Sequence, residues 1–339
     1  MEEIKNLASI NFPWENLNNK HVLISGGSGM IGSSLVELFM HRNRYFNNNI
    51  KVTVIARDKN KITKKFTKLL NNDNFNYIIH DINNPLDASC YNYIFHTASN
   101  THPNSYSTDP IGTITTNILG TYNLLNGASS NLNKFIFLSS VEIYGENNSD
   151  ILKFDEDFSG YINCNTLRAG YPESKRVSES LCQAFISEKS YNISIARVSR
   201  IYTPSSQNDS KATSQFIKNA RFKQDIVLKS KGEQLYSFIS LNDAIEGLLY
   251  VFFYGKNSEA YNIANDDNGI TLYDFANKLA ELSNVSIKFE LPNEVEAKGF
   301  SVVRNAVMSV EKLKSLGWRQ RTTLENGLKK ILNDIVEIM

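Results

Sequence analysis

Residues 21–32 read HVLISGGSGMIG and join a short apolar run to a glycine-rich turn. The apolar run is typical of a strand that is buried on both faces of a parallel sheet. Glycines at 26, 29 and 32 allow a tight turn and a close approach to a pyrophosphate, which would rest on the N-terminus of the following helix. The alternative is a tight turn without a ligand. The strand–loop–helix order favours a dinucleotide site formed by Gly26, Gly29, Met30, Ile31 and Gly32.

Further apolar runs repeat this pattern along the first 200 residues. We expect strands at 52–56, 77–81, 93–97, 135–139 and 193–197, with helices around 113–130 and 174–189 between them. Strands that alternate with helices predict an α/β fold, a Rossmann-type doubly wound parallel sheet.

Near residue 200 the sequence changes from regular strand–helix alternation to a loop-like segment followed by helices and short strands. We therefore expect a domain boundary there. An NAD(P)-binding Rossmann domain is expected over 1–199, with 1–19 as an N-terminal extension and about 237–262 returning to it. A smaller C-terminal lobe that binds the substrate is expected over 200–339, with a final helix near 322–336.

Composition narrows the class of protein. A net charge of +1 gives no reason to expect nucleic acid or a membrane surface as a partner. No apolar run reaches the roughly 18 residues that span a bilayer. The N-terminus lacks a leader pattern, and the three separated cysteines are typical of reduced thiols, so we expect a cytoplasmic protein. The five histidines lack ligand spacing, and no metal site is expected.

The ends of the early strands bear on the choice of dinucleotide. An acid at the end of the second strand would bond the ribose of NAD, but Ala56 and Arg57 stand there. Arginine suits a 2′-phosphate, so NADP(H) is favoured and NAD(H) is the alternative, with Asp58 contacting the ribose. Asp81 either bonds the adenine or belongs to a simple turn. Ala98 is also expected to contact the cofactor.

A second group of residues carries proton-transfer chemistry. Tyr171 and Lys175 lie four residues apart at the start of a predicted helix and therefore share one face. A cation beside the phenol is expected to lower its pKa and make it a usable acid/base. Ser140 follows an apolar strand and is placed to bond a substrate oxygen. Glu142 is either a base or a partner in an ion pair at the rim of the site.

Together these motifs resemble the extended short-chain dehydrogenase/reductase family, and within it the NAD-dependent epimerase/dehydratases of nucleotide sugars. The resemblance covers about 20–330 and includes the tail motif at 316–318, Leu-Gly-Trp. It implies a nucleoside-diphosphate sugar in the C-terminal lobe and a homodimer formed through the helices at 113–130 and 174–189. It also implies that Tyr171 is the acid/base, that Lys175 modulates it and binds the ribose, and that Ser140 polarises the reacting oxygen.

Departures from the family pattern guide the choice of reaction. Val141 stands where sugar 4,6-dehydratases carry a proton-donating Asp, which argues against dehydration. Segment 166–176 is similar to UDP-glucuronate decarboxylases, but those enzymes carry an arginine in the segment that matches 234–236 and an asparagine near position 200, where this chain has Tyr236 and Arg200. The implied substrate-binding residues are Ser140, Arg200, Lys211 and Gln234.

These departures favour a net reductase that draws on NADPH. The lead hypothesis is reduction of a nucleotide-activated 4-keto-6-deoxyhexose, such as dTDP-4-dehydro-6-deoxyglucose to dTDP-fucose, for the O-antigen of surface lipopolysaccharide. The alternative is an NAD-dependent nucleotide-sugar epimerase, dehydratase or UDP-glucuronate decarboxylase. A minor alternative is a non-enzymatic NADP(H) sensor, against which the intact Ser140, Tyr171 and Lys175 argue.

Overall fold

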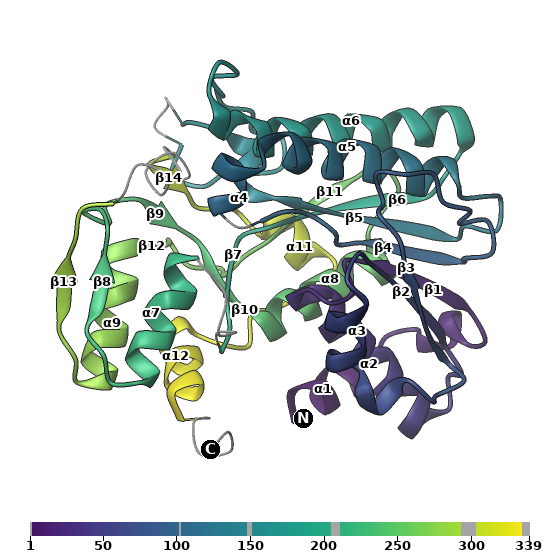
Figure 1. The fold of residues 1–339 in the computed structure, drawn as a ribbon, viewed down its shortest axis with the longest axis horizontal. Helices are drawn as coiled ribbons and strands as arrows, with labels where there is room; N and C mark the ends of the chain where they lie inside the picture. Colours follow the sequence, from purple (N-terminus) through teal and green to yellow (C-terminus); the bar gives the residue numbers. More distant parts are fainter. Residues whose placement is uncertain (1, 102, 148–150, 205–210, 293–302, 334–339) are drawn as a thin grey trace.

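A seven-stranded sheet lies at the centre of the larger part of the molecule, and its neighbouring strands are all parallel (Figure 1). The computed structural model describes residues 2–101, 103–147, 151–204, 211–292 and 303–333. The strand order β11-β6-β5-β4-β1-β2-β3 confirms the predicted Rossmann-type α/β fold. The strands are β1 His21–Ser25, β2 Lys51–Ala56, β3 Phe75–Ile79, β4 Tyr93–His96, β5 Lys134–Ser140, β6 Ile193–Val198 and β11 Ala260–Ile263.

One predicted strand is displaced. The third strand was expected at 77–81, but β3 begins at Phe75 and ends at Ile79. The buried Phe75 side chain, which packs against Phe66, anchors the earlier start. Asp81 therefore lies in the turn beyond the strand.

Helices cover both faces of this sheet (Figure 1). One face carries α5 and α6, which pack against each other, and the other carries α2, α3 and α8. The buried contact between α5 and α6 is partly polar, since Asn117 Nδ2 donates to Ser174 Oγ at 2.8 Å. These helices are α2 Met30–Phe46, α3 Lys59–Lys65, α5 Pro110–Asn126, α6 Gly170–Lys189 and α8 Leu241–Tyr254.

The segment after residue 240 returns to the sheet. Helix α8 packs on β6 and α2, and β11 pairs with β6 along residues 260–263. At the N-terminus, α1 (Glu2–Ala8) packs against α2, and the ring of Phe12 stacks on Phe253 of α8 at 5.0 Å between centroids. The domain boundary at residue 199 stays a prediction.

The remaining elements form a smaller lobe beside the carboxyl edge of the sheet (Figure 1). It holds a three-stranded sheet, β12-β9-β14, and a pair, β13-β8, while β7 pairs with β10. Its strands are β7 Arg200–Tyr202, β8 Ile226–Leu228, β9 Leu235–Tyr236, β10 Phe238–Ser240, β12 Ile270–Thr271, β13 Ile287–Phe289 and β14 Asn305–Ala306. Its helices are α7 Ala212–Arg221, α9 Leu272–Ser283 and α12 Leu324–Asn333, whereas α11 Glu311–Ser315 packs against β11 and α8 of the larger part.

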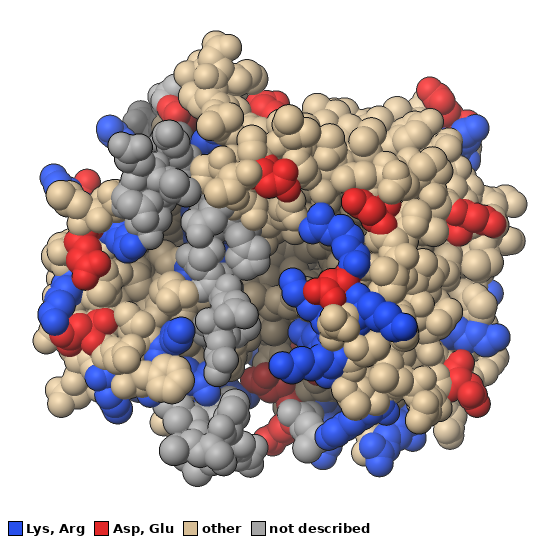
Figure 2. Space-filling view, viewed as in Figure 1, with Lys and Arg blue, Asp and Glu red and all other residues tan. Residues whose placement is uncertain are grey.

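The two parts of the chain meet around a hollow. Strand β14 contacts the short 3₁₀ helix η3 (Val141–Tyr144), which directly follows β5. Figure 2 shows the hollow between the two lobes, with Lys and Arg side chains gathered along its edge. No helix in the described part of the chain is long and apolar enough to cross a membrane.

Candidate active site

The glycine-rich turn after β1 is shaped by close backbone packing. Gly26 has a φ of +69°, and a Cβ there would lie 2.7 Å from the Cα of Ala98. A Cβ on Gly32 would lie 2.6 Å from the carbonyl oxygen of Gly26. Neither position has room for a side chain, so the turn and the residues after β4 form one compact unit.

This unit leaves hydrogen-bond donors for a phosphate. Helix α2 begins at Met30 after Gly29, which supplies no capping side chain. The N–H groups of the first helical turn, including Met30, Ile31 and Gly32, therefore lack helical partners. The partial positive charge at a helix N-terminus favours an anion in front of it. The turn thus fits the pyrophosphate of a dinucleotide, as expected from the glycine spacing.

The polar residues that follow β2 and β3 form different hydrogen bonds. Arg57 is exposed just after β2, and its Nη2 donates to Asn100 Oδ1 at 3.4 Å. Asp58 caps α3 by accepting the backbone N–H of Asn60 at 2.9 Å. Asp81 accepts the backbone N–H of Asn83 at 3.0 Å, which is the turn role that its sequence left open. Both carboxylates therefore hold local turns, and the guanidinium is the group presented at the end of β2.

The proposed proton-transfer residues come together at the carboxyl end of β5. Tyr171 lies in the first turn of α6 and is buried, and the neighbouring Ser140 and Ser99 side chains favour the phenolate form of its hydroxyl. Lys175 lies one turn further along α6 and donates from Nζ to the carbonyl oxygen of Leu138 at 2.7 Å. The arrangement gives a buried phenol and a hydroxyl that can share one substrate oxygen.

The electrostatics around Tyr171 differ from the sequence-based expectation. Burial raises the pKa of Tyr171, the hydrogen bond from Ser140 opposes this rise, and Glu142 adds to it. Among cations, Arg168 lowers the pKa of Tyr171 most, although Lys175 was expected to do so. Burial also lowers the pKa of Lys175 to about 7. The Lys175 ammonium mainly stabilises the end of β5, because its hydrogen bond is donated to a backbone carbonyl of that strand.

Glu142 forms an ion pair, one of the two roles that its sequence allowed. Its Oε2 lies 2.7 Å from Arg168 Nη2, and its Oε1 lies 3.6 Å from Arg200 Nη2. The guanidinium of Arg200 also stacks on the ring of Tyr236, 3.8 Å from the ring centre. A base role for Glu142 stays a proposal. The contact joins the Rossmann part to β7 and β9 of the lobe.

Two further predicted substrate residues belong to the lobe. Gln234 precedes β9, and its buried Oε1 has no hydrogen-bond partner among the described residues. Lys211 stands directly before α7 as its N-cap residue. Unsatisfied buried acceptors are costly, so Gln234 is suited to receive a ligand donor.

Sequence reasoning missed two side chains of the site. The ring of Tyr106, from α4 (Pro103–Thr108), lies 5.0 Å from that of Tyr171, and the Arg168 guanidinium lies 4.6 Å from the Tyr106 ring. Arg168 was within reach of sequence analysis, because it precedes Tyr171 by three residues inside segment 166–176. Tyr106 carried no such signal.

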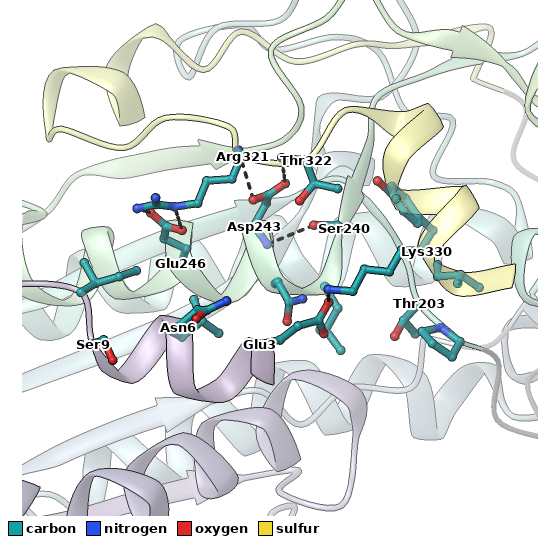
Figure 3. A pocket seen from close by; sticks show the side chains of 18 of the residues that line it. Glu3, Asn6, Ser9, Thr203, Ser240, Asp243, Glu246, Arg321, Thr322 and Lys330 are labelled. Atoms are coloured by element: carbon teal, nitrogen blue, oxygen red, sulfur yellow. Dashed lines mark hydrogen bonds and ion pairs between the residues drawn. The ribbon is translucent and has the colours of Figure 1, made fainter. Parts of the chain in front are cut away.

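A separate cavity of about 640 Å³ lies between α1, α8 and α12 (Figure 3). None of the predicted site residues lines it. Its charged groups are paired internally, Arg321 with Glu246 and Lys330 with Glu3. Its buried carboxylate, Asp243, accepts backbone N–H groups from residues 321 and 322. Paired charges point to a structural junction between the N-terminal and C-terminal helices.

Comparisons with known proteins agree with this geometry. Residues 22–264 match the model of the NAD dependent epimerase/dehydratase family. The chain is 30% identical over 321 residues to UDP-glucuronic acid decarboxylase 5 of Arabidopsis thaliana, covering 94% of this chain and 89% of that protein. It is 28% identical over 317 residues to UDP-glucuronic acid decarboxylase 1 of Xenopus tropicalis, covering 93% and 72% of the two chains.

A solved structure shows the same fold. UDP-glucuronic acid 4-epimerase of Bacillus cereus, in complex with UDP-glucuronic acid and NAD, superposes with a TM-score of 0.76 at 22% identity. The superposition covers 94% of this chain and 100% of that one. These findings confirm the resemblance to the extended short-chain dehydrogenase/reductases that act on nucleotide sugars. The chain is an enzyme that belongs to the NAD-dependent epimerase/dehydratase family.

Proposed function

We propose that this enzyme decarboxylates a nucleoside-diphosphate hexuronic acid, with UDP-glucuronic acid as the candidate, using NAD that is regenerated in place. The observation that carries the proposal is the buried Tyr171 phenol next to Ser140 at the carboxyl edge of the sheet, with Glu142 and its two arginine partners close by. The curated relatives named above are decarboxylases of this substrate. They favour this alternative over the reductase that the sequence departures suggested.

The position of Arg200 removes an objection to this reading. The resembled decarboxylases carry an arginine in the segment that matches 234–236, and its absence from this segment counted against decarboxylation. In the structure Arg200 stacks on Tyr236, so a guanidinium lies beside residue 236 although it comes from β7. A cation is therefore present at that edge of the site. Arg200 and Lys211 are proposed to hold the diphosphate of the substrate.

The chain's own residues account for the proton transfers. The glycine turn and the N-terminus of α2 would hold NAD, which supplies the hydride acceptor for C-4 and returns the hydride at the end. Tyr171 takes the proton of the C-4 hydroxyl, while Ser140 hydrogen-bonds the same oxygen.

Decarboxylation follows from the chemistry of the ketone at C-4. The C-6 carboxylate is then β to a carbonyl, so the C-5 to C-6 bond breaks and CO₂ leaves. The electron pair moves into an enolate whose oxygen Tyr171 and Ser140 stabilise. C-5 takes up one proton, and Tyr171 returns a proton to O-4 when the ketone is reduced. Substrate and one proton thus give a nucleotide pentose and CO₂.

One observation favours a second candidate, the NADPH-dependent reductase of a 4-keto-6-deoxyhexose. Arg57 is exposed at the end of β2, and Ala56 leaves no acid to repel a 2′-phosphate. A net reductase would consume NADPH and would release no CO₂. Its candidate product, a dTDP-6-deoxyhexose for O-antigen, rests on the sequence departures alone.

The two candidates are separated by product analysis. Purified enzyme is incubated with UDP-glucuronic acid and NAD, and CO₂ and the nucleotide sugar are measured by mass spectrometry, with UDP-glucose as the substrate lacking a carboxylate. We expect CO₂, a UDP-pentose and one deuterium at C-5 in heavy water. A UDP-hexuronic acid inverted at C-4 without CO₂ would indicate an epimerase. NADPH consumption with a nucleotide 4-keto sugar, and no reaction with UDP-glucuronic acid, would establish the reductase instead.

A further inference from the structure

Three side chains from separate elements form a stack that ends at the proposed catalytic phenol. Arg168 comes from the 3₁₀ helix η4 (Leu167–Ala169), Tyr106 from α4 and Tyr171 from α6. The Arg168 guanidinium lies 4.6 Å from the centre of the Tyr106 ring, and that ring is tilted by 30° against the Tyr171 ring. Both tyrosines are buried, so the stack is shielded from solvent.

The charge of Arg168 is held in place beside this stack. Its Nη2 pairs with Glu142 at 2.7 Å, and only 12% of its side chain is exposed. Its Nε and Nη1 are buried and have no hydrogen-bond partner among the described residues. A buried guanidinium is costly unless it is paired, and the Tyr106 ring and Glu142 supply the compensation. Arg168 is therefore fixed in position rather than mobile at the surface.

Two other cations in this region, Lys175 and Arg200, have different partners. Lys175 donates to the carbonyl of Leu138, and its Nζ lies 4.8 Å from the centre of the Phe137 ring. Arg200 reaches Glu142 at the longer distance of 3.6 Å. Arg168 is thus the closer of the two arginines to the carboxylate that faces Tyr171.

We propose that Arg168 is a positioning residue for proton transfer: it holds the Tyr171 ring through Tyr106 and offsets the negative charge of Glu142 beside the phenol. The inference rests on the proposed role of Tyr171 as the proton-transfer group. Groups from the surrounding elements face Tyr171: Ser140 from β5, Glu142 from η3, Ser99 from the loop after β4, Tyr106 from α4 and Arg168 from η4. Lys175, one turn further along α6, points to the carbonyl of Leu138.

The sign of the effect follows from the charges. Removing the cation destabilises the phenolate, so Arg168→Met should raise the pKa of Tyr171. Removing the anion has the opposite effect, so Glu142→Gln should lower that pKa. A phenol that must accept a proton then needs a higher pH in the first variant and a lower pH in the second. A general structural defect would not move the two variants in opposite directions.

The first measurement does not depend on the substrate. Tyrosine labelled with ¹³C at Cζ is titrated by NMR, and the Tyr171 signal is assigned from Tyr171→Phe. We expect displacement of about one pH unit or more in opposite directions for Arg168→Met and Glu142→Gln. Arg44→Met is the matched control, because Arg44 stacks on the exposed Tyr45 outside the site. The control should leave the Tyr171 titration unchanged.

The second measurement uses the pH–rate profile of the full-length enzyme. In Arg168→Met the acid limb of kcat should move to higher pH, and kcat at pH 7 should fall about tenfold, with the KM for the sugar within about threefold. Arg168→Lys restores the charge and should recover part of the rate. Tyr106→Leu removes the ring that joins the stack and should resemble Arg168→Met, whereas Tyr106→Phe keeps the ring and should not.

Several results would overturn the inference. One is an unchanged Tyr171 titration in both Arg168→Met and Glu142→Gln. Another is a change confined to KM, which would make Arg168 a substrate ligand. If Arg168→Met does not fold, Tyr106→Leu is the test variant, and a wild-type pH–rate profile in Tyr106→Leu refutes the inference. An enzyme that converts no hexuronic acid but shows the opposed titrations would sink the proposed function and leave this inference standing.

Discussion

Gly26→Ala tests whether the turn after β1 holds the cofactor, and the structure sets the size of the effect. Gly26 adopts a φ of +69°, where a side chain costs about 1–2 kcal/mol. The added Cβ would also lie 2.7 Å from the Cα and 2.8 Å from the nitrogen of Ala98. These are backbone atoms that cannot rotate away, and such overpacking costs about 1–3 kcal/mol. The expected loss is about 2–5 kcal/mol, or at least about 4 °C in Tm.

Relief of this strain requires the turn and the Ala98 backbone to move apart, which displaces the donors that face the pyrophosphate. We therefore expect the Kd for NAD to rise about tenfold or more, as measured by calorimetry. Gly29→Ala is the matched control, since its φ is −72° and its Cβ would meet only the Gly26 carbonyl at 3.1 Å. It should change Tm much less, and it serves as the control for stability only. Equal Tm and Kd in Gly26→Ala and the wild type would refute the reasoning.

Three further predictions concern catalysis, cofactor choice and assembly. Tyr171→Phe keeps the buried ring but lacks the hydroxyl, so kcat should fall about 10²–10⁴-fold with the Kd for NAD nearly unchanged; turnover near wild type would remove Tyr171 from the mechanism. Arg57→Ala should weaken NADP(H) by up to about fivefold, the worth of an exposed ion pair, and spare NAD(H); equal weakening of both would contradict the 2′-phosphate role. The enzyme should sediment as a dimer at micromolar concentration, and Leu119→Arg, on the exposed face of α5, should release monomers; an unchanged dimer would place the interface elsewhere.

The sequence predicted the parts of the site that follow from local geometry. Two residues four apart share a helical face, so Tyr171 and Lys175 could be proposed before any fold was known. Ser140 was proposed because parallel strands place functional groups at their carboxyl ends. The strand at 77–81 was misplaced by two residues, because the packing of Phe75 against Phe66 decides where β3 begins.

What the sequence by itself determined is the order of strands and helices, the glycine turn and the chemical type of the proton-transfer residues, since each depends on short-range spacing. Only the tertiary structure decided the partners. Arg200 meets Tyr236 because β7 and β9 are brought to one edge of the lobe, and Arg168 meets Tyr106 across segments far apart in the chain. The cation beside the phenol is consequently Arg168, because Lys175 is drawn to the carbonyl of Leu138. Spacing along the chain fixes which side chains share a face, but packing between elements fixes which charges they meet.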